Sequence, residues 1–98
     1  MTEKAIVNSI LRYLNSLPQC RAEKTWGGGY GNAGKPDITG CLKGRRFELE
    51  VKKPGGKPTP LQKVTLEQWK EAGAIVAVVH SVDEVKEIMK EAEAKCEK

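Results

Sequence analysis

The feature that most constrains this chain is an alternation of apolar and polar residues on both sides of Lys43-Gly44. A glycine-containing dipeptide between two such runs is typical of a β-hairpin. The alternation therefore predicts antiparallel strands over 37–42 and 45–52. If the residues pair symmetrically about the turn, Ile38 faces Leu49 and Gly40 faces Phe47.

This register gives the hairpin one apolar and one polar face. The apolar face, which is expected to pack on the core, consists of Ile38, Gly40, Leu42, Phe47, Leu49 and Val51. The polar face consists of Asp37, Thr39, Cys41, Glu48, Glu50 and Lys52. The hairpin therefore predicts a core on one side and a surface that can carry chemistry on the other.

The segment before the hairpin has the pattern of a helix followed by a strand. Apolar residues at helical spacing predict a helix over 2–17 that begins at Thr2 and ends before Pro18. A short strand is expected over 20–26, and a glycine-rich loop follows at 27–34.

The segment after the hairpin predicts a helix, a strand and a second helix. A loop at 54–60 leads into a capping box, Thr59-Pro60-Leu61-Gln62, and into a helix that runs to Ala72. The apolar run Ala74–Val79 predicts a strand buried on both faces. The segment 81–84 predicts a second capping box at the start of the last helix. We therefore expect an α/β fold in the order α-β-β-β-α-β-α, with a mixed central sheet flanked by helices.

Length and composition limit the classes of protein that this chain can represent. Its 98 residues predict one domain over 1–98, and its net charge of +4 suits a polyanionic partner without proving one. Three cysteines and one histidine argue against a disulfide framework and a Cys/His zinc site. Neither a signal peptide nor a membrane-length apolar run is visible. We expect a soluble, cytoplasmic protein without membrane contact.

The polar face of the hairpin carries the residues most suited to catalysis. In the symmetric register Asp37 lies opposite Glu50, with Cβ atoms roughly 5 Å apart, and like charges so placed destabilise a sheet. A divalent cation removes the repulsion, and oxygen ligands favour Mg²⁺, with Mn²⁺ as a substitute. Lys52 projects from the same face. This set predicts metal-dependent hydrolysis of phosphodiesters; the alternative is a solvated sheet face on which Lys52 screens Glu50.

These residues also resemble a known signature. Pro36-Asp37 followed by Glu50-Val51-Lys52 resembles the motif of PD-(D/E)XK nucleases. Together with Gly34-Lys35, the segment 48–54, Gln62 and Trp69 to Gly73, it resembles the VRR-NUC (virus-type replication-repair nuclease) domain. The resemblance covers nearly the whole chain, and it implies a single small PD-(D/E)XK nuclease-like domain.

The resemblance also implies roles for particular residues. It implies metal ligation by Asp37, Glu50 and the main-chain carbonyl of Val51, catalytic support from Lys52, and an auxiliary catalytic role for Gln62. Glu3 matches the acidic residue that the family carries on its first helix, which implies that Glu3 is a further metal ligand. Its alternative is a favourable charge at a helix N-terminus. For Gln62 the alternative is completion of the capping box with Thr59.

The remaining polar and aromatic residues give weaker predictions. Four residues on or beside the glycine-rich loops are candidate nucleic-acid contacts, or else ordinary solvated side chains: Tyr30, Lys35, Lys53 and Lys57. Glu48 is interpreted as structural, or as a charge partner of Arg46. Trp26 and Trp69 are interpreted as core or interface residues. For His80, which follows a buried strand, a satisfied core histidine and a catalytic role are both left open, with the core role favoured.

The function implied by the resemblance is a Mg²⁺-dependent DNA endonuclease. Small relatives of this kind act on branched DNA as homodimers, like Holliday-junction resolvases, in phage or prophage replication and repair. Two sites in a dimer also suit the cutting of two strands. The alternatives are a non-catalytic nucleic-acid-binding module with a degenerate site, and a nuclease for flaps, single strands or RNA ends.

Overall fold

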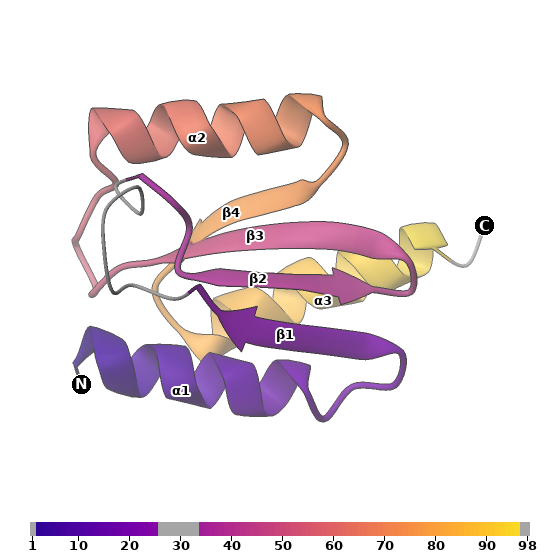
Figure 1. The fold of residues 1–98 in the computed structure, drawn as a ribbon. Helices are drawn as coiled ribbons and strands as arrows, with labels where there is room; N and C mark the ends of the chain where they lie inside the picture. The colour runs from indigo at the N-terminus through magenta and orange to yellow at the C-terminus, as the bar shows by residue number, and fades with distance from the viewer. Residues whose placement is uncertain (1, 26–33, 97–98) are drawn as a thin grey trace.

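The computed structural model describes residues 2–25 and 34–96. Within them the elements follow the expected order α-β-β-β-α-β-α: α1 (Glu3–Leu14), β1 (Cys20–Lys24), β2 (Ile38–Leu42), β3 (Arg45–Val51), α2 (Pro60–Glu71), β4 (Ile75–Val79) and α3 (Val82–Cys96). The strands form one mixed sheet, with α2 on one face and with α1 and α3 on the other (Figure 1). The predicted fold class is confirmed.

The hairpin has the register that the alternation predicts. Ile38 pairs with Leu49 and Gly40 pairs with Phe47, although each strand is one residue shorter than expected at its outer end. Lys43 and Gly44 both have positive φ, at 49° and 86°, as a two-residue type I′ turn requires. The predicted register is therefore confirmed, and Asp37 and Lys52 lie immediately outside the paired strands.

Gly40 is required by the packing of the apolar face. A Cβ atom at this position would lie 2.4 Å from the ring of Phe47 and 2.4 Å from the carbonyl oxygen of Arg21. The Phe47 ring covers the glycine, and both belong to the side of the sheet that faces α1 and α3. The core on this side is formed by Ile6, Val7, Ile10, Leu14, Ala22, Ile38, Leu42, Phe47, Leu49, Val51, Val79, Val85, Met89 and Ala92.

Helix α1 begins as predicted and ends earlier than predicted. Thr2 caps it by accepting a hydrogen bond from the Ala5 N–H. The predicted end at residue 17 is wrong, because the helix stops at Leu14. The Asn15 side chain accepts from the Ala22 N–H and donates to the Ala22 carbonyl, so it binds the next strand where the helix would otherwise continue.

The caps of the two later helices differ from each other. The Thr59 hydroxyl accepts from the Gln62 N–H and the Gln62 side chain accepts from the Thr59 N–H, which confirms the first capping box. At α3, Ser81 Oγ accepts from the Glu84 N–H, but the Glu84 carboxylate accepts from the His80 N–H. The second box is therefore only half formed.

Strand β4 is less buried than predicted, so the prediction of a strand buried on both faces is corrected. It lies at the edge of the sheet and pairs in parallel with β3 alone, and among its residues only Val79 is fully buried. Helices α2 and α3 contact β4 from opposite faces, which explains why its residues are apolar. Its outer edge has no neighbouring strand among the described residues, so most of its residues are only partly buried. In the part of the chain described here, no helix has the length and apolar character needed to cross a bilayer.

Candidate active site

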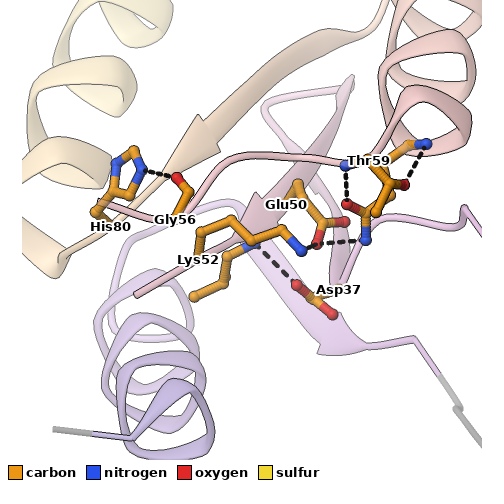
Figure 2. Close-up of polar contacts among 8 residues, drawn as sticks. Asp37, Glu50, Lys52, Gly56, Thr59 and His80 are labelled. Atoms are coloured by element: carbon orange, nitrogen blue, oxygen red, sulfur yellow. Dashed lines mark hydrogen bonds and ion pairs between the residues drawn. The ribbon is translucent and has the colours of Figure 1, made fainter. Parts of the chain in front are cut away.

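The site lies at one end of the hairpin, on the sheet face covered by α2. Glu50 is on β3, Lys52 follows the strand directly, and Asp37 immediately precedes β2. Figure 2 shows the three side chains turned toward one another, with the start of α2 beside them. The period of two along a strand accounts for Glu50 and Lys52 sharing a face, and the hairpin register brings Asp37 beside them.

Glu50 is a buried carboxyl group, with 1% of its surface exposed. Its Oε2 atom accepts a hydrogen bond from Gln62 Nε2 at 3.1 Å and lies 3.5 Å from Lys52 Nζ. Its Oε1 atom is buried and has no hydrogen-bond partner among the described residues. Burial raises the pKa of Glu50 to about 8, the neighbouring Asp37 carboxylate adds to the rise, and Lys52 opposes it. In the absence of a cation, this group therefore favours the protonated form near neutral pH.

Asp37 is held by the backbone of β3. Its Oδ2 atom accepts a hydrogen bond from the Val51 N–H at 2.9 Å. The last pair of the ladder is Ile38 with Leu49, so Asp37 lies just beyond the strand and does not form a regular cross-strand pair with Glu50. The two carboxyl groups nevertheless interact closely enough to affect the pKa of Glu50.

Lys52 is anchored through its backbone as well as its side chain. Its N–H donates to the Val79 carbonyl oxygen at 2.9 Å, which continues the β3–β4 pairing by one hydrogen bond. The side chain is 18% exposed and lies against Glu50. Its ammonium group therefore lies beside the buried carboxylate and still has access to solvent.

The two carboxyl groups suit a hard divalent cation. A buried carboxylate oxygen without a donor, next to a second carboxylate, is an unfavourable arrangement that a cation relieves. Mg²⁺ is commonly held by one or two carboxylates, with waters and substrate phosphates completing its shell. Val51, whose main-chain carbonyl is a ligand implied by the VRR-NUC resemblance, lies between Glu50 and Lys52 in the chain and is fully buried.

Glu3 is not part of a three-residue metal-binding cluster among the described residues. It lies half-buried in the first turn of α1, and in residues 2–25 and 34–96 no three His, Cys, Asp or Glu side chains gather closely enough to hold a metal together. The implied role of Glu3 as a ligand stays a prediction. Of the predicted metal ligands with carboxylate side chains, the structure brings together Asp37 and Glu50.

A second polar cluster, which the motifs do not predict, lies farther along the same face. Glu48 is 3% exposed and accepts hydrogen bonds from Arg46 Nε at 2.9 Å and from the Thr39 hydroxyl. The Arg46 guanidinium carbon lies 4.2 Å from the centre of the Trp69 ring. The predicted pairing of Glu48 with Arg46 is thus present. The contact with Trp69 depends on how α2 crosses the sheet, which no local pattern reveals.

The structure describes some of the remaining candidates and leaves others outside its described residues. Lys35, Lys53 and Lys57 are exposed, whereas Tyr30 and Trp26 lie outside the described residues. His80 is half-buried, and its Nε2 atom is 3.2 Å from the Gly56 carbonyl oxygen (Figure 2). His80 therefore connects β4 to the loop that leads into α2.

Comparisons with known proteins give a consistent result at the level of structure. The sequence matches no protein-family model and no curated protein. Among solved structures, one named "VRR_NUC domain" superposes with a TM-score of 0.74 at 27% identity, covering 90% of this chain and 94% of that one. Another, named "VRR_NUC domain protein", has a TM-score of 0.73 at 17% identity and covers 92% and 86% of the two chains; it supports the fold alone. The resemblance seen in the sequence is confirmed by structure, and this chain has the fold of a VRR_NUC domain.

Proposed function

We propose that this chain is a metal-dependent nuclease that hydrolyses phosphodiester bonds in DNA. The observation that carries the proposal is the buried Glu50 carboxyl group, which has an unpartnered oxygen and lies beside Asp37 and Lys52. A merely structural ion pair does not need a second carboxylate next to it. The neighbour named "VRR_NUC domain", at 27% identity, supports a nuclease-type domain independently of this geometry.

In the proposed mechanism each residue of the site has a distinct role. Asp37, Glu50 and the Val51 carbonyl would hold Mg²⁺ or Mn²⁺, and the bound ion would supply charge stabilisation at the phosphate and lower the pKa of a water. Lys52 places its ammonium group beside the reacting phosphate and offsets the negative charge that develops there. Gln62 keeps Glu50 in position by donating to its Oε2 atom. Glu3 is proposed only as a further ligand.

The finer features of the proposal concern the substrate and the assembly. We propose branched DNA as the substrate, a homodimer as the active assembly, and a role in phage or prophage replication and repair. These features rest on the VRR-NUC resemblance. The dimer also has a physical reason, since a symmetric pair presents two sites to two strands. Light scattering at micromolar concentration tests the assembly, and a monomer would favour an enzyme that acts on flaps or ends.

A cleavage panel tests the activity. Four-way junction, flap, duplex and single-stranded DNA are incubated with the protein in Mg²⁺ and in EDTA. We expect cleavage in Mg²⁺ only, and a loss of two or more orders of magnitude in Asp37→Asn and Glu50→Gln. The matched control is Glu67→Gln, which removes the charge of an exposed residue on α2.

The same panel separates the alternatives. Cleavage in EDTA, or full activity in Glu50→Gln, would refute the metal site. Binding of DNA without cleavage under all conditions would identify a non-catalytic binding module. Preference for the flap or the single strand would replace the junction as the proposed substrate.

A further inference from the structure

The cluster around Arg46 lines a cavity of about 600 Å³. The cavity lies between the second half of helix α2, strand β1 and the segment before β2. Its lining residues include Lys24, Lys35, Thr39, Arg46, Glu48 and Trp69. Glu23 also lines it, so the cations exceed the carboxylates by one. A smaller cavity of about 250 Å³ shares Thr39 and Arg46 with it and extends across β1 and β2.

Arg46 is held in one orientation although much of it is exposed. The exposed fraction of its side chain is 53%. Its Nε atom donates to Glu48, its Nη2 atom donates to Thr39 Oγ1 at 3.1 Å, and its guanidinium stacks on Trp69. Fixing so long a side chain costs rotamer entropy, and an exposed ion pair offsets little of that cost. The guanidinium is half-exposed and still has two hydrogen-bond acceptors, one of which is a buried carboxylate. This arrangement suits a group that must keep a fixed orientation to bind a ligand.

The position of Arg46 relative to the carboxylate pair suits a neighbouring phosphate. Glu48 and Glu50 lie two residues apart on the same face of β3, which corresponds to roughly 7 Å along the strand. The guanidinium of Arg46 contacts Glu48, so it lies about that far from the Glu50 carboxyl group. This length is close to the distance between neighbouring phosphates of one strand, because the backbone winds around the axis as well as rising by ~3.4 Å per step.

We propose that Arg46 binds a substrate phosphate one or two nucleotides from the bond that is cut. Glu48, Thr39 and Trp69 are positioning residues that hold the guanidinium, and the bound strand follows the cavity between α2 and β1. Arginine suits this role because its planar donors match phosphate oxygens, and a pre-oriented side chain loses less entropy on binding. The inference rests on the proposed nuclease function and adds a substrate-binding residue outside the catalytic motif.

The test compares Arg46→Ala with Arg12→Ala. Arg12 is exposed on α1, across the sheet, so both substitutions change the net charge equally. Binding of a fluorescent oligonucleotide, single-stranded or duplex, is measured in EDTA over a series of salt concentrations. We expect Arg46→Ala to bind about tenfold or more weakly and to reduce the slope of log K against log salt by ~0.7–0.9. Arg12→Ala should leave the slope unchanged.

Two further variants separate phosphate binding from a structural role. Arg46→Lys keeps the charge, so its salt slope should equal that of the wild type. Its affinity for the oligonucleotide should lie between those of the wild type and Arg46→Ala. Glu48→Gln keeps Arg46 and should weaken binding without changing the slope. In Mg²⁺, Arg46→Ala should raise KM more than it lowers kcat, because it removes a contact made before and during the reaction. Melting curves identify any variant that fails to fold.

The outcomes distinguish this inference from the proposed function. If the wild type cleaves DNA while Arg46→Ala and Arg12→Ala bind alike, the inference is wrong and the nuclease function stands. If the wild type never cleaves but Arg46→Ala alone loses affinity and slope, the phosphate site stands and the function fails. If the wild type shows no salt-dependent binding, the phosphate site is wrong.

Discussion

Gln62 joins the first turn of α2 to the buried carboxyl group of Glu50. Its side-chain oxygen accepts from the Thr59 N–H at 2.8 Å, and its amide nitrogen donates to Glu50 Oε2 at 3.1 Å. The sequence offers a capping role and a site role as alternatives, and the structure contains the contacts of both. One side chain therefore restrains the helix and a candidate metal ligand together.

The first prediction separates these two contacts with Gln62→Glu. Glutamate at this position still completes the capping box, but it brings a third carboxylate against Glu50. We expect the melting temperature of the metal-free protein to fall, and Mg²⁺ or Mn²⁺ to restore more stability than it adds to the wild type. Gln68→Glu, at an exposed position of α2, is the control. Equal melting temperatures for the two metal-free variants would show that residue 62 does not face the carboxylates.

The second prediction concerns Glu50→Gln. Above pH 8, where Glu50 is ionised, the amide removes a repulsion between carboxylates, whose size is about 0.5–1 kcal/mol if it equals that of like charges on neighbouring strands. We expect the metal-free variant to melt a few degrees higher than the wild type. Divalent ions should stabilise the wild type much more than the variant, so their thermal-shift curves should converge or cross as metal is added. Equal metal-induced shifts in the two proteins would place the cation elsewhere.

The third prediction is a pH dependence of stability in the metal-free protein. The folded-state pKa of Glu50 is about 8, above its ordinary value of 4.5. Between these values the folded protein binds the proton more tightly than the unfolded chain does, so stability falls as the pH rises, by at most roughly 1.4 kcal/mol per pH unit. Melting in EDTA from pH 4.5 to 9 should show this fall in the wild type. Glu50→Gln should show a smaller one, and parallel curves would assign the proton uptake to other groups.

The fourth prediction separates metal binding from turnover at Lys52. Lys52→Met keeps the length of the side chain and removes the ammonium group beside Glu50. We expect thermal shifts with Mg²⁺ to persist while cleavage falls by about two or more orders of magnitude, because the charge that develops on the phosphate loses its partner. Lys90→Met, at an exposed position of α3, is the matched control. Loss of the metal-induced shift together with turnover would make Lys52 a structural part of the cation site.

The features that the sequence predicts well depend on local patterns. The hairpin register follows from alternation and a two-residue turn, and it alone places Asp37, Glu50 and Lys52 together. The first capping box is equally local. An apolar run, in contrast, indicates that both faces of a strand are covered, but it does not indicate whether both edges are paired. For this reason β4 is predicted as buried on both faces, whereas it lies at the edge of the sheet and only Val79 is fully buried.

The features that the sequence does not predict depend on contacts between separate elements. Helix α1 stops at Leu14 because Asn15 binds the backbone of Ala22, which belongs to the next strand. The stacking of Arg46 on Trp69 requires α2 to cross β3 at a particular place. The distance of Glu3 from the carboxylate pair likewise depends on how α1 docks, which its own residues do not specify.

The compact placement of the site on one hairpin has a consequence for folding kinetics. Asp37, Glu50 and Lys52 lie at the open end of a hairpin whose strands are joined by a two-residue turn. Only this short hairpin has to close for them to meet, whereas Gln62 arrives with α2. The hairpin therefore brings the two carboxyl groups together before the helix restrains them. In refolding experiments at pH 9 without metal, relief of the repulsion by Glu50→Gln should act mainly on the folding rate, and Gln62→Ala mainly on the unfolding rate. The polar arrangement that suits this chain for catalysis thus also slows an early step in its own assembly.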